Sequence, residues 1–333
     1  MGGRDIPTAV AVDPSLSKAM RPQRALFLVD LGLIPAHVIW AWQAAGHQIV
    51  EIWICGKPSR GAWKRDRRLG WFAPHWSLSA TISQYAIPAR EIDNIKANSD
   101  AARAMATSDL DVIISVHFMH ILSAELLAKL SKPVLNLHPA LLPAYRGPSP
   151  LVAMLVDETT DQYGGVTLHE IVPAIDAGAI FAAQAVPLPA NRNFRAWEIH
   201  LARAAARLAA EAIPDVLAGH LKGVPQREEE ASYRRPTTKE IAITSQMTSA
   251  HVAWLCSTLG KVVPLSTVAD GREYPVTGIV RNLGLPTKRP PRVGYWTIDL
   301  DLMDQRVRLR RKPNWEGRRR RIETWLMRVV SPP

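Results

Sequence analysis

Continuous apolar runs alternate with helix-like segments along the first two thirds of the chain. Residues 24–30 (RALFLVD) and 48–55 (QIVEIWIC) predict two buried strands, with an amphipathic helix over 35–46 between them. A further strand is predicted over 113–116, after an Asp-rich approach. This strand–helix–strand order is typical of an α/β fold with a mostly parallel sheet. No GxGxxG motif follows the first strand, so the sequence does not indicate dinucleotide binding.

The middle of the chain continues the same alternation. Helices are predicted over 123–130, where Ser123 serves as the N-cap, and over 149–156. A strand over 166–171 and a long Ala-rich helix over 194–217 follow, with Pro214 expected to kink or end that helix.

After residue 221 the pattern changes. Residues 222–240 combine prolines with an acidic run and predict a linker. Beyond it, the segments 276–280, 294–302 and 305–309 predict short strands, and YWTIDLDL alternates as a half-exposed strand does. We therefore expect a flexible N-terminal tail over 1–23, an α/β domain over 24–221, a linker over 222–240 and a β-rich domain over 241–333.

Charge separates the same two parts. Lys/Arg and Asp/Glu cancel over residues 1–230, and residues 231–333 carry the whole net charge of +11. The basic part is expected to prefer an anion such as nucleic acid, a nucleotide sugar or a membrane surface. Nine basic residues and one acid fall within 306–321, and this density indicates repulsion that a bound anion would relieve. Residues 56–76 predict a basic, aromatic-rich loop, which is either a solvated surface or a clamp for an anionic acceptor.

Composition narrows the class of protein. Apolar residues make up 47%, no apolar run reaches membrane-spanning length, and the N-terminus lacks the apolar core of a signal peptide. Cys55 and Cys256 have neither metal-ligand nor redox spacing. We therefore expect a cytoplasmic protein without a membrane partner and without a metal.

Candidate chemistry lies at the end of the strand over 134–137. Asn136 and His138 alternate on it, so their side chains project to one face, and Pro139 then forces a turn. Asp176 follows in another apolar run that ends in a small-residue turn. An Asn, a His and an Asp at strand ends of an open sheet predict an acyl-transfer site.

These residues resemble a known family. Asn136, His138, the LLP turn at 141–143, Arg146-Gly147 and the Asp176-x-Gly178 turn occur in the order typical of the 10-formyltetrahydrofolate-dependent formyltransferases, over roughly 24–230. That family includes methionyl-tRNA formyltransferase and the sugar N-formyltransferases. The resemblance implies a Rossmann-like catalytic domain and, from the tRNA enzyme, a small open-barrel (OB-like) C-terminal domain.

The resemblance also implies site residues. Asn136, His138 and Asp176 would be catalytic, with Asn136 and a protonated His138 stabilising the charge on the tetrahedral intermediate and Asp176 with His138 moving protons. The formyl donor would be 10-formyltetrahydrofolate. Its folate-binding residues would be Phe118, Met119, His120, Ile121, Leu122, Ala140, Leu141, Leu142 and Pro143. The acceptor-binding residues would be Arg60, Lys64, Arg65, Arg67, Arg68 and Arg146. We expect no chemical role for the side chains of His117 and His120, and a structural role for His169.

The acceptor is left with alternatives. Ala140 stands where relatives often have Ser, and YRGPSP at 145–150 is closer to sugar and other amine formyltransferases than to the WRGAAP of the housekeeping tRNA enzyme. This favours an amino-sugar nucleotide. The basic loop and the basic C-terminal part favour aminoacyl-tRNA, since nucleic acid would suit the C-terminal domain. A hydrolase that passes the formyl group to water, or a catalytically silent nucleic-acid-binding protein, are the remaining hypotheses.

Overall fold

The computed structural model describes residues 21–55, 58–92, 95, 99–237, 239–261, 263 and 265–311. Most of the predicted tail over 1–23, and the part of the basic run beyond residue 311, lie outside the described residues. None of the helices among the described residues combines the length and apolar content needed to cross a bilayer.

The first two thirds of the chain form a seven-stranded sheet in the order β3-β2-β1-β4-β5-β6-β7. The first five strands are parallel, and β6 and β7 are antiparallel additions at one edge. The prediction of a mostly parallel α/β sheet is confirmed. The strands are β1 (Arg24–Val29), β2 (Gln48–Cys55), β3 (Ala89–Ile92), β4 (Val112–Val116), β5 (Val134–His138), β6 (Gly165–Glu170) and β7 (Ile180–Ala185).

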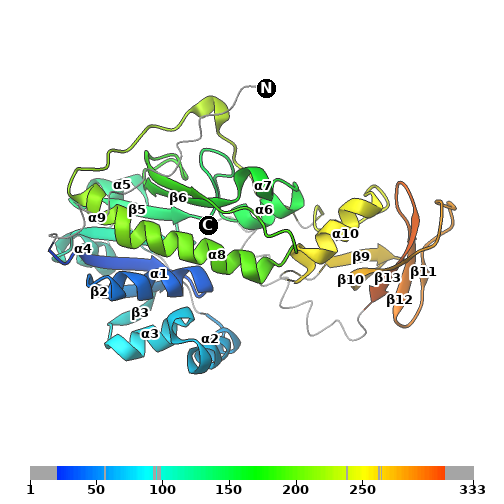
Figure 1. Cartoon of the computed structure of the whole chain (residues 1–333), viewed down its shortest axis with the longest axis horizontal. Coiled ribbons are helices and arrows are strands. Elements are labelled where there is room, and N and C mark those ends of the chain that lie inside the picture. The colour runs from blue at the N-terminus through cyan, green and yellow to red at the C-terminus, as the bar shows by residue number, and fades with distance from the viewer. Residues whose placement is uncertain are drawn as a thin grey trace.

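Both faces of this sheet are buried. Along β1, Phe27 packs into a core that includes residues of α1 (Leu33–Ala44) and α8 (Phe194–Arg207). The neighbouring Leu28 packs into a second core that includes residues of α4 (Asp100–Thr107) and α5 (Ala124–Ala128). Figure 1 shows α1 and α8 side by side across the sheet. Helices on both faces explain why β1, β4 and β5 are buried along almost their whole length rather than at alternate positions.

The Ala-rich segment after β7 is one long helical stretch with a local change of pitch. A π-helical turn, Leu208–Ala212, joins α8 to α9 (Ile213–Leu217). Pro214 is the second residue of α9, two residues after the π-helical turn. Because a proline cannot donate to the carbonyl one turn back, the helix rearranges before it. The remaining helices of this part are α3 (Leu78–Tyr85), α6 (Pro150–Val156) and α7 (Thr160–Tyr163).

One prediction about this part is wrong. Residues 56–76 were expected to form a loop, but they contain α2 (Arg60–Phe72) and a 3-10 turn at Pro74–Trp76. The Ser59 side chain accepts from the Ala62 N–H and caps the helix. Asp66 faces inward and accepts from the N–H groups of Leu78 and Ser79 at the start of α3. Polar contacts, rather than an apolar stripe, hold this helix against the protein. Its sequence therefore lacks the apolar periodicity that predicts a helix.

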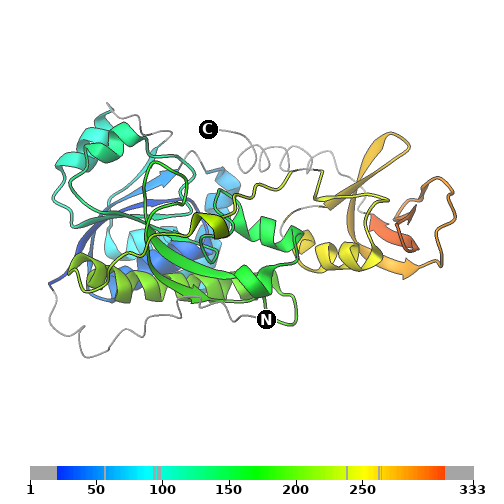
Figure 2. The ribbon, with the colours of Figure 1, turned by 90° about the horizontal axis from the view of Figure 1, so that it is seen from above.

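The last part of the chain forms a second sheet, in the order β11-β12-β13-β10-β9-β8. This confirms a β-rich C-terminal region. Figures 1 and 2 show the second sheet at the far end of the molecule from the first, with α10 (Ser249–Ser257) between them. The strands are β8 (Ala242–Ile243), β9 (Leu265–Ala269), β10 (Arg272–Asn282), β11 (Arg292–Val293), β12 (Thr297–Asp301) and β13 (Arg306–Arg311).

Arginines of β13 are partly neutralised inside this sheet. Arg306 pairs with Asp301 at 2.7 Å, and Arg308 pairs with Asp299 at 2.7 Å, both across to β12. For these two arginines, neighbouring carboxylates already supply the counter-charge that the sequence suggested an external anion would provide.

Candidate active site

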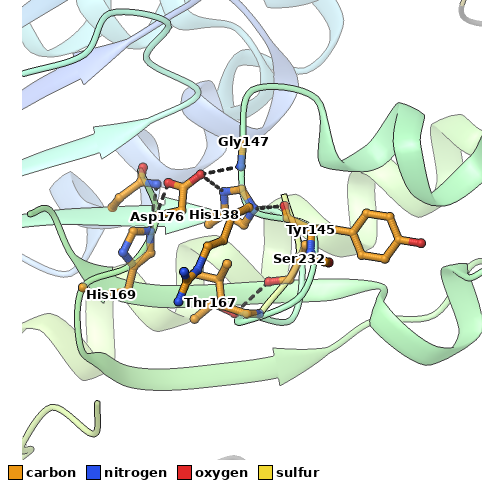
Figure 3. A network of polar contacts seen from close by, with 12 residues as sticks. His138, Tyr145, Gly147, Thr167, His169, Asp176 and Ser232 are labelled. Atoms are coloured by element: carbon orange, nitrogen blue, oxygen red, sulfur yellow. Dashed lines mark hydrogen bonds and ion pairs between the residues drawn. The ribbon is translucent and has the colours of Figure 1, made fainter. Parts of the chain in front are cut away.

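Two strands place the predicted polar residues in one layer. Asn136 and His138 alternate on β5, and the antiparallel register sets Asn136 opposite His169 and His138 opposite Thr167 of β6. Residues directly opposite across strands have neighbouring side chains on the same face. Figure 3 shows this cluster, with Asp176 reaching it from the turn between β6 and β7.

His169 determines how the Asn136 amide points. Burial is the main cause that lowers the pKa of His169, to about 4, so its imidazole is neutral near pH 7. Its Nδ1 lies 2.7 Å from the Glu170 carbonyl and must donate to it. Its Nε2 is then an acceptor, and the Asn136 Nδ2 donates to it at 3.0 Å. One of the two hydrogens on Nδ2 is thereby fixed, and the other remains for a ligand.

The Tyr145 backbone fixes His138 in a similar way. His138 is buried, and its Nε2 donates to the Tyr145 carbonyl at 3.0 Å. Tyr145 has a left-handed backbone with a φ of 58°, a strained conformation for a side chain of this size. Its own N–H donates to the Ser232 hydroxyl at 2.9 Å, which helps to hold this conformation. The remaining nitrogen, Nδ1, is the one that can exchange a proton with a substrate.

Asp176 faces both imidazoles. Its Oδ2 lies 3.6 Å from His138 Nδ1, and its Oδ1 lies 3.6 Å from His169 Nε2. The Gly147 N–H donates to Oδ2 at 2.8 Å, and the carboxylate remains partly open, with 16% of its side chain exposed. Asp176 has a left-handed φ of 50°, so the turn that presents it is strained.

The glycine two residues after Asp176 is required by close packing. A Cβ at Gly178 would lie 2.0 Å from the Glu170 carbonyl oxygen. The second residue of the Arg146-Gly147 pair is similarly restricted, because Gly147 has a φ of 115° and its Cβ would lie 2.9 Å from the Tyr233 ring. Gly178 therefore lets the Asp176 turn approach the Glu170 backbone, and Gly147 leaves room for the Tyr233 ring while its N–H donates to Asp176.

A further histidine borders the site. His117, at the end of β4, has a left-handed φ of 56°. Burial, followed by the charge of nearby His138, lowers the pKa of His117 to about 4. This loop histidine is therefore neutral near pH 7 and lies close enough to affect His138 electrostatically.

The same cluster has a composition that could hold a metal ion. Ligand atoms of His138, His169 and Asp176 all lie within 4.8 Å of one another. Two histidines and a carboxylate bind divalent metals in other proteins. Here the Nε2 of His169 is engaged by Asn136, whose amide would have to turn away before that nitrogen could bind a metal.

The residues predicted to bind folate fall into two groups. Ala140, Leu141 and Leu142 are buried, and their N–H groups donate within the protein to His138, Tyr163 and Thr167 respectively. Pro143 is half-buried, and its carbonyl accepts from the Ser232 N–H. In the second group, Leu122 is buried, Ile121 is 49% exposed, and Phe118, Met119 and His120 are half-buried. The second group offers the more accessible apolar surface.

The residues predicted to bind the acceptor lie in two places. Arg146 is buried beside the site, where it pairs with Glu228 at 2.8 Å and donates to the Gln226 side-chain oxygen. The others lie on α2, which follows β2 in the chain. In the sheet, β1 and β4 lie between β2 and β5, the strand that carries Asn136 and His138. They are exposed on its surface: Arg60, Lys64, Arg65, Arg67 and Arg68.

Sequence reasoning missed several contacts of the site. Gln226 and Ser232 come from the segment predicted as a linker, and they bond to Asp176 and to Tyr145 respectively. Thr167 donates to the Ala140 carbonyl and accepts from the Leu142 N–H, which fixes the LLP turn. These partners are brought in by tertiary structure, and only the β5–β6 register would have revealed Thr167 and His169.

Comparison with known proteins supports this description. Residues 71–217 match a family model described as Formyl transferase. The sugar 3N-formyl transferase WlaRD, solved in the presence of dTDP and 5-N-formyl-THF, is similar with a TM-score of 0.60 and 14% identity, over 89% of this chain and 100% of WlaRD. An N-formyltransferase from Helicobacter canadensis, in complex with folinic acid and dTDP-3-aminofucose, gives 0.59 and 15%, over 88% and 100%.

A larger protein shares the same fold. HypX from Aquifex aeolicus, in complex with tetrahydrofolic acid, is similar with a TM-score of 0.57 and 14% identity, over 86% of this chain and 43% of HypX. At these identities the likeness to the solved structures shows a shared fold.

Proposed function

We propose that this chain is a formyltransferase that moves a formyl group from 10-formyltetrahydrofolate to a primary amine of a nucleotide-linked amino sugar; residues 71–217 match the family model. The observation that carries the proposal is the convergence of Asn136, His138 and Asp176 on one partly open cluster. The similar solved proteins that carry folates and dTDP-linked ligands support the choice of donor and acceptor.

Asn136 supplies the electrostatic part of catalysis. In the reaction, a bond forms between the acceptor nitrogen and the formyl carbon, and the bond from that carbon to N10 breaks. Negative charge develops on the formyl oxygen between these events. The second hydrogen of Asn136 Nδ2, left over after the bond to His169, is available to that oxygen. Loss of one such preorganised donor typically costs about 10²–10³ in rate.

His138 and Asp176 supply the proton transfers. The acceptor amine must lose a proton, and N10 must gain one. Because His138 Nε2 is committed to the Tyr145 carbonyl, the proton is taken up at Nδ1, where Asp176 Oδ2 stabilises the imidazolium. The same nitrogen then returns a proton to N10. Asp176 thus acts by charge and orientation, and His138 acts as the carrier.

The folate is expected to lie along the 117–122 loop. Half-buried Phe118 and Met119 and exposed Ile121 provide apolar contacts of the kind that ligand pockets need. Since the N–H groups of Ala140, Leu141 and Leu142 are already used, the LLP turn contributes shape and carbonyl groups rather than donors.

A second acceptor class is favoured by a specific observation. The outward face of α2 carries five basic residues followed by Trp71 and Phe72, which are 78% and 85% exposed. Arginines that meet phosphates and aromatic rings that stack on bases suit a nucleic acid. Aminoacyl-tRNA is therefore the alternative acceptor.

The experiment is formyl transfer from labelled donor to a panel of amino-sugar nucleotides and to initiator Met-tRNA in parallel. We expect labelling of an amino sugar, and a rate loss of about 10²-fold or more for each of Asn136→Ala, His138→Ala and Asp176→Ala. Exposed Asp161 on α7 offers a matched control, and Asp161→Ala should keep the wild-type rate.

Three results would contradict the proposal. A full-rate Asp176→Ala enzyme would remove the catalytic role of the cluster. Labelling of Met-tRNA alone would assign the acceptor to the second class. Loss of rate after dialysis against a chelator, restored by a divalent metal, would show that the His138–His169–Asp176 cluster works as a metal site.

A further inference from the structure

A segment that follows α9 crosses the active site before the chain reaches the second sheet. We call residues 224–234 the strap. At one end, Val224 exchanges two backbone hydrogen bonds of 2.8 Å with Ile180 of β7. At the other, the Arg146 N–H donates to the Ser232 carbonyl at 2.8 Å, and the Arg234 N–H donates to the Arg146 carbonyl at 3.2 Å. The strap therefore adds a short strand-like pairing to the catalytic loop.

Gln226 is the residue of the strap that touches the Asp176 turn. Its Nε2 donates to the Asp176 carbonyl at 2.7 Å and to the Gly178 carbonyl at 2.8 Å. Its Oε1 accepts from Arg146 Nε at 3.1 Å and from Nη2 at 2.8 Å. One amide thus joins the turn that presents Asp176 to the residue that precedes Gly147.

Two separate contacts therefore connect the Asp176 turn to the 146–147 segment. Gln226 contacts the backbone carbonyl of Asp176 and the side chain of Arg146. The N–H of Gly147, the next residue after Arg146, donates to Asp176 Oδ2 at 2.8 Å. Asp176 has a left-handed φ of 50°, which turns the backbone away from its preferred conformation. A conformation of this kind persists only when surrounding contacts hold it.

We infer that Gln226 is a positioning residue for the formyl-transfer reaction, holding the Asp176 turn so that its carboxylate faces His138 Nδ1. The inference rests on the proposed function. It assigns a catalytic contribution to a residue outside the formyltransferase domain match, which ends at residue 217. It also requires a glutamine, because only an amide supplies two donors to the carbonyls and an acceptor to the guanidinium from one end.

The side chain can be altered without removing its bulk. Gln226→Glu keeps the shape and the acceptor oxygen for Arg146 but replaces both donated hydrogen bonds by repulsion between oxygens. Gln226→Met keeps the length and loses every polar contact. Glu229→Ala, at an exposed position three residues along the strap, is the matched control.

The test combines kinetics with hydrogen exchange. For Gln226→Glu we expect kcat to fall about 10- to 100-fold, with KM for the donor and for the acceptor within about twofold of wild type. We expect the Gly147 amide, whose acceptor is Asp176 Oδ2, to exchange at least about tenfold faster, while amides of β1 and β4 keep their protection. Gln226→Met should show the same pattern, and Glu229→Ala should match the wild type.

Two other results would overturn the inference. An unchanged kcat in Gln226→Glu would overturn the inference even if exchange accelerates, and a fall in kcat without faster exchange at Gly147 would overturn the route through Asp176. Hydrogen exchange is measured without substrate, so the positioning of the turn is tested even if the wild type transfers no formyl group. In that event the proposed function fails separately, by the absence of wild-type turnover.

Discussion

At the scale of single residues, the site depends on which polar atoms remain available to a ligand after the hydrogen bonds within the protein are made. Asn136 has one hydrogen left because His169 accepts the other, and His138 keeps Nδ1 available because the Tyr145 carbonyl accepts from Nε2. Asn136, His138 and Asp176 could be predicted from their spacing and from family resemblance. His169 was expected to be structural; what the sequence could not show is that the β5–β6 register places it against Asn136.

Acid should destabilise the fold through buried His169 and half-buried His117. The pKa of His169 and that of His117 each fall from 6.5 to about 4 on burial, so the unfolded chain binds more protons between those values. The free energy of unfolding should therefore decrease as pH falls from about 6.5 to 4, by up to roughly 3 kcal/mol per histidine. The charges of Asp176 and Arg146 act on the pKa of His169 in the folded state, as does a proton on His138 when it is present.

Urea unfolding at pH 7, 6 and 5 measures this slope. His169→Gln keeps an amide that can accept from Asn136 and removes one titrating group. We expect its stability to depend less on pH than that of the wild type, by about one proton or roughly 1.4 kcal/mol per pH unit within the window. Parallel slopes for the two proteins would show that His169 binds protons equally in the folded and unfolded chains, so that the fold does not lower its pKa.

At the scale of elements, the sequence predicts five of the seven strands of the first sheet and misses β3, β7 and α2. β1 is a nearly continuous buried apolar run, whereas β3 (AREI) has one buried residue and gives no such signal. In α2, the inward positions are Ala62, Trp63, Asp66, Leu69 and Gly70, so two small residues and a carboxylate replace the usual apolar stripe. The outward positions are exposed, and apart from Gly61 they are all basic or aromatic: Arg60, Lys64, Arg65, Arg67, Arg68, Trp71 and Phe72.

Reversing one charge on this outward face should weaken binding of an anionic acceptor. For Arg68→Glu we expect the acceptor KM to rise about tenfold at low ionic strength, with the donor KM unchanged and the effect shrinking as salt is added. Arg207→Glu, on an exposed turn at the end of α8, is the matched charge reversal and should have little effect. An unchanged acceptor KM in Arg68→Glu would exclude this face of α2 from acceptor binding.

At the scale of the whole molecule, contacts around α10 join the first sheet to the second, and one buried apolar cluster includes residues of both parts. Trp254 of α10 is central among them, because its Nε1 donates to the Leu155 carbonyl at 2.6 Å and its ring lies under the Arg192 guanidinium at 4.8 Å. Arg234 adds charge contacts to Asp157 and Glu240. Such contacts between chain segments far apart in sequence could not be predicted from periodicity, which reports only local structure.

Truncating Trp254 should separate the unfolding of the two sheets. Trp254→Ala removes the ring, its hydrogen bond and its cation–π contact, at a cost of about 3 kcal/mol. We expect calorimetry to show one transition for the wild type and two for Trp254→Ala, with the second sheet melting first. Trp254→Phe keeps a ring and should show an intermediate separation; a single transition for Trp254→Ala would show that other contacts couple the sheets.

The course of the strap has a consequence for building chimaeras. The seven-stranded sheet is complete by residue 185 and its helices by residue 217, so a recombination point just after residue 221 would look natural from the fold. Such a junction would replace Gln226, Ser232 and Arg234 by residues of another protein, and with them the contacts that support Asp176 and Tyr145. Exchange of acceptor specificity between relatives should therefore be attempted with the junction beyond residue 240, where the strap travels with the site it supports.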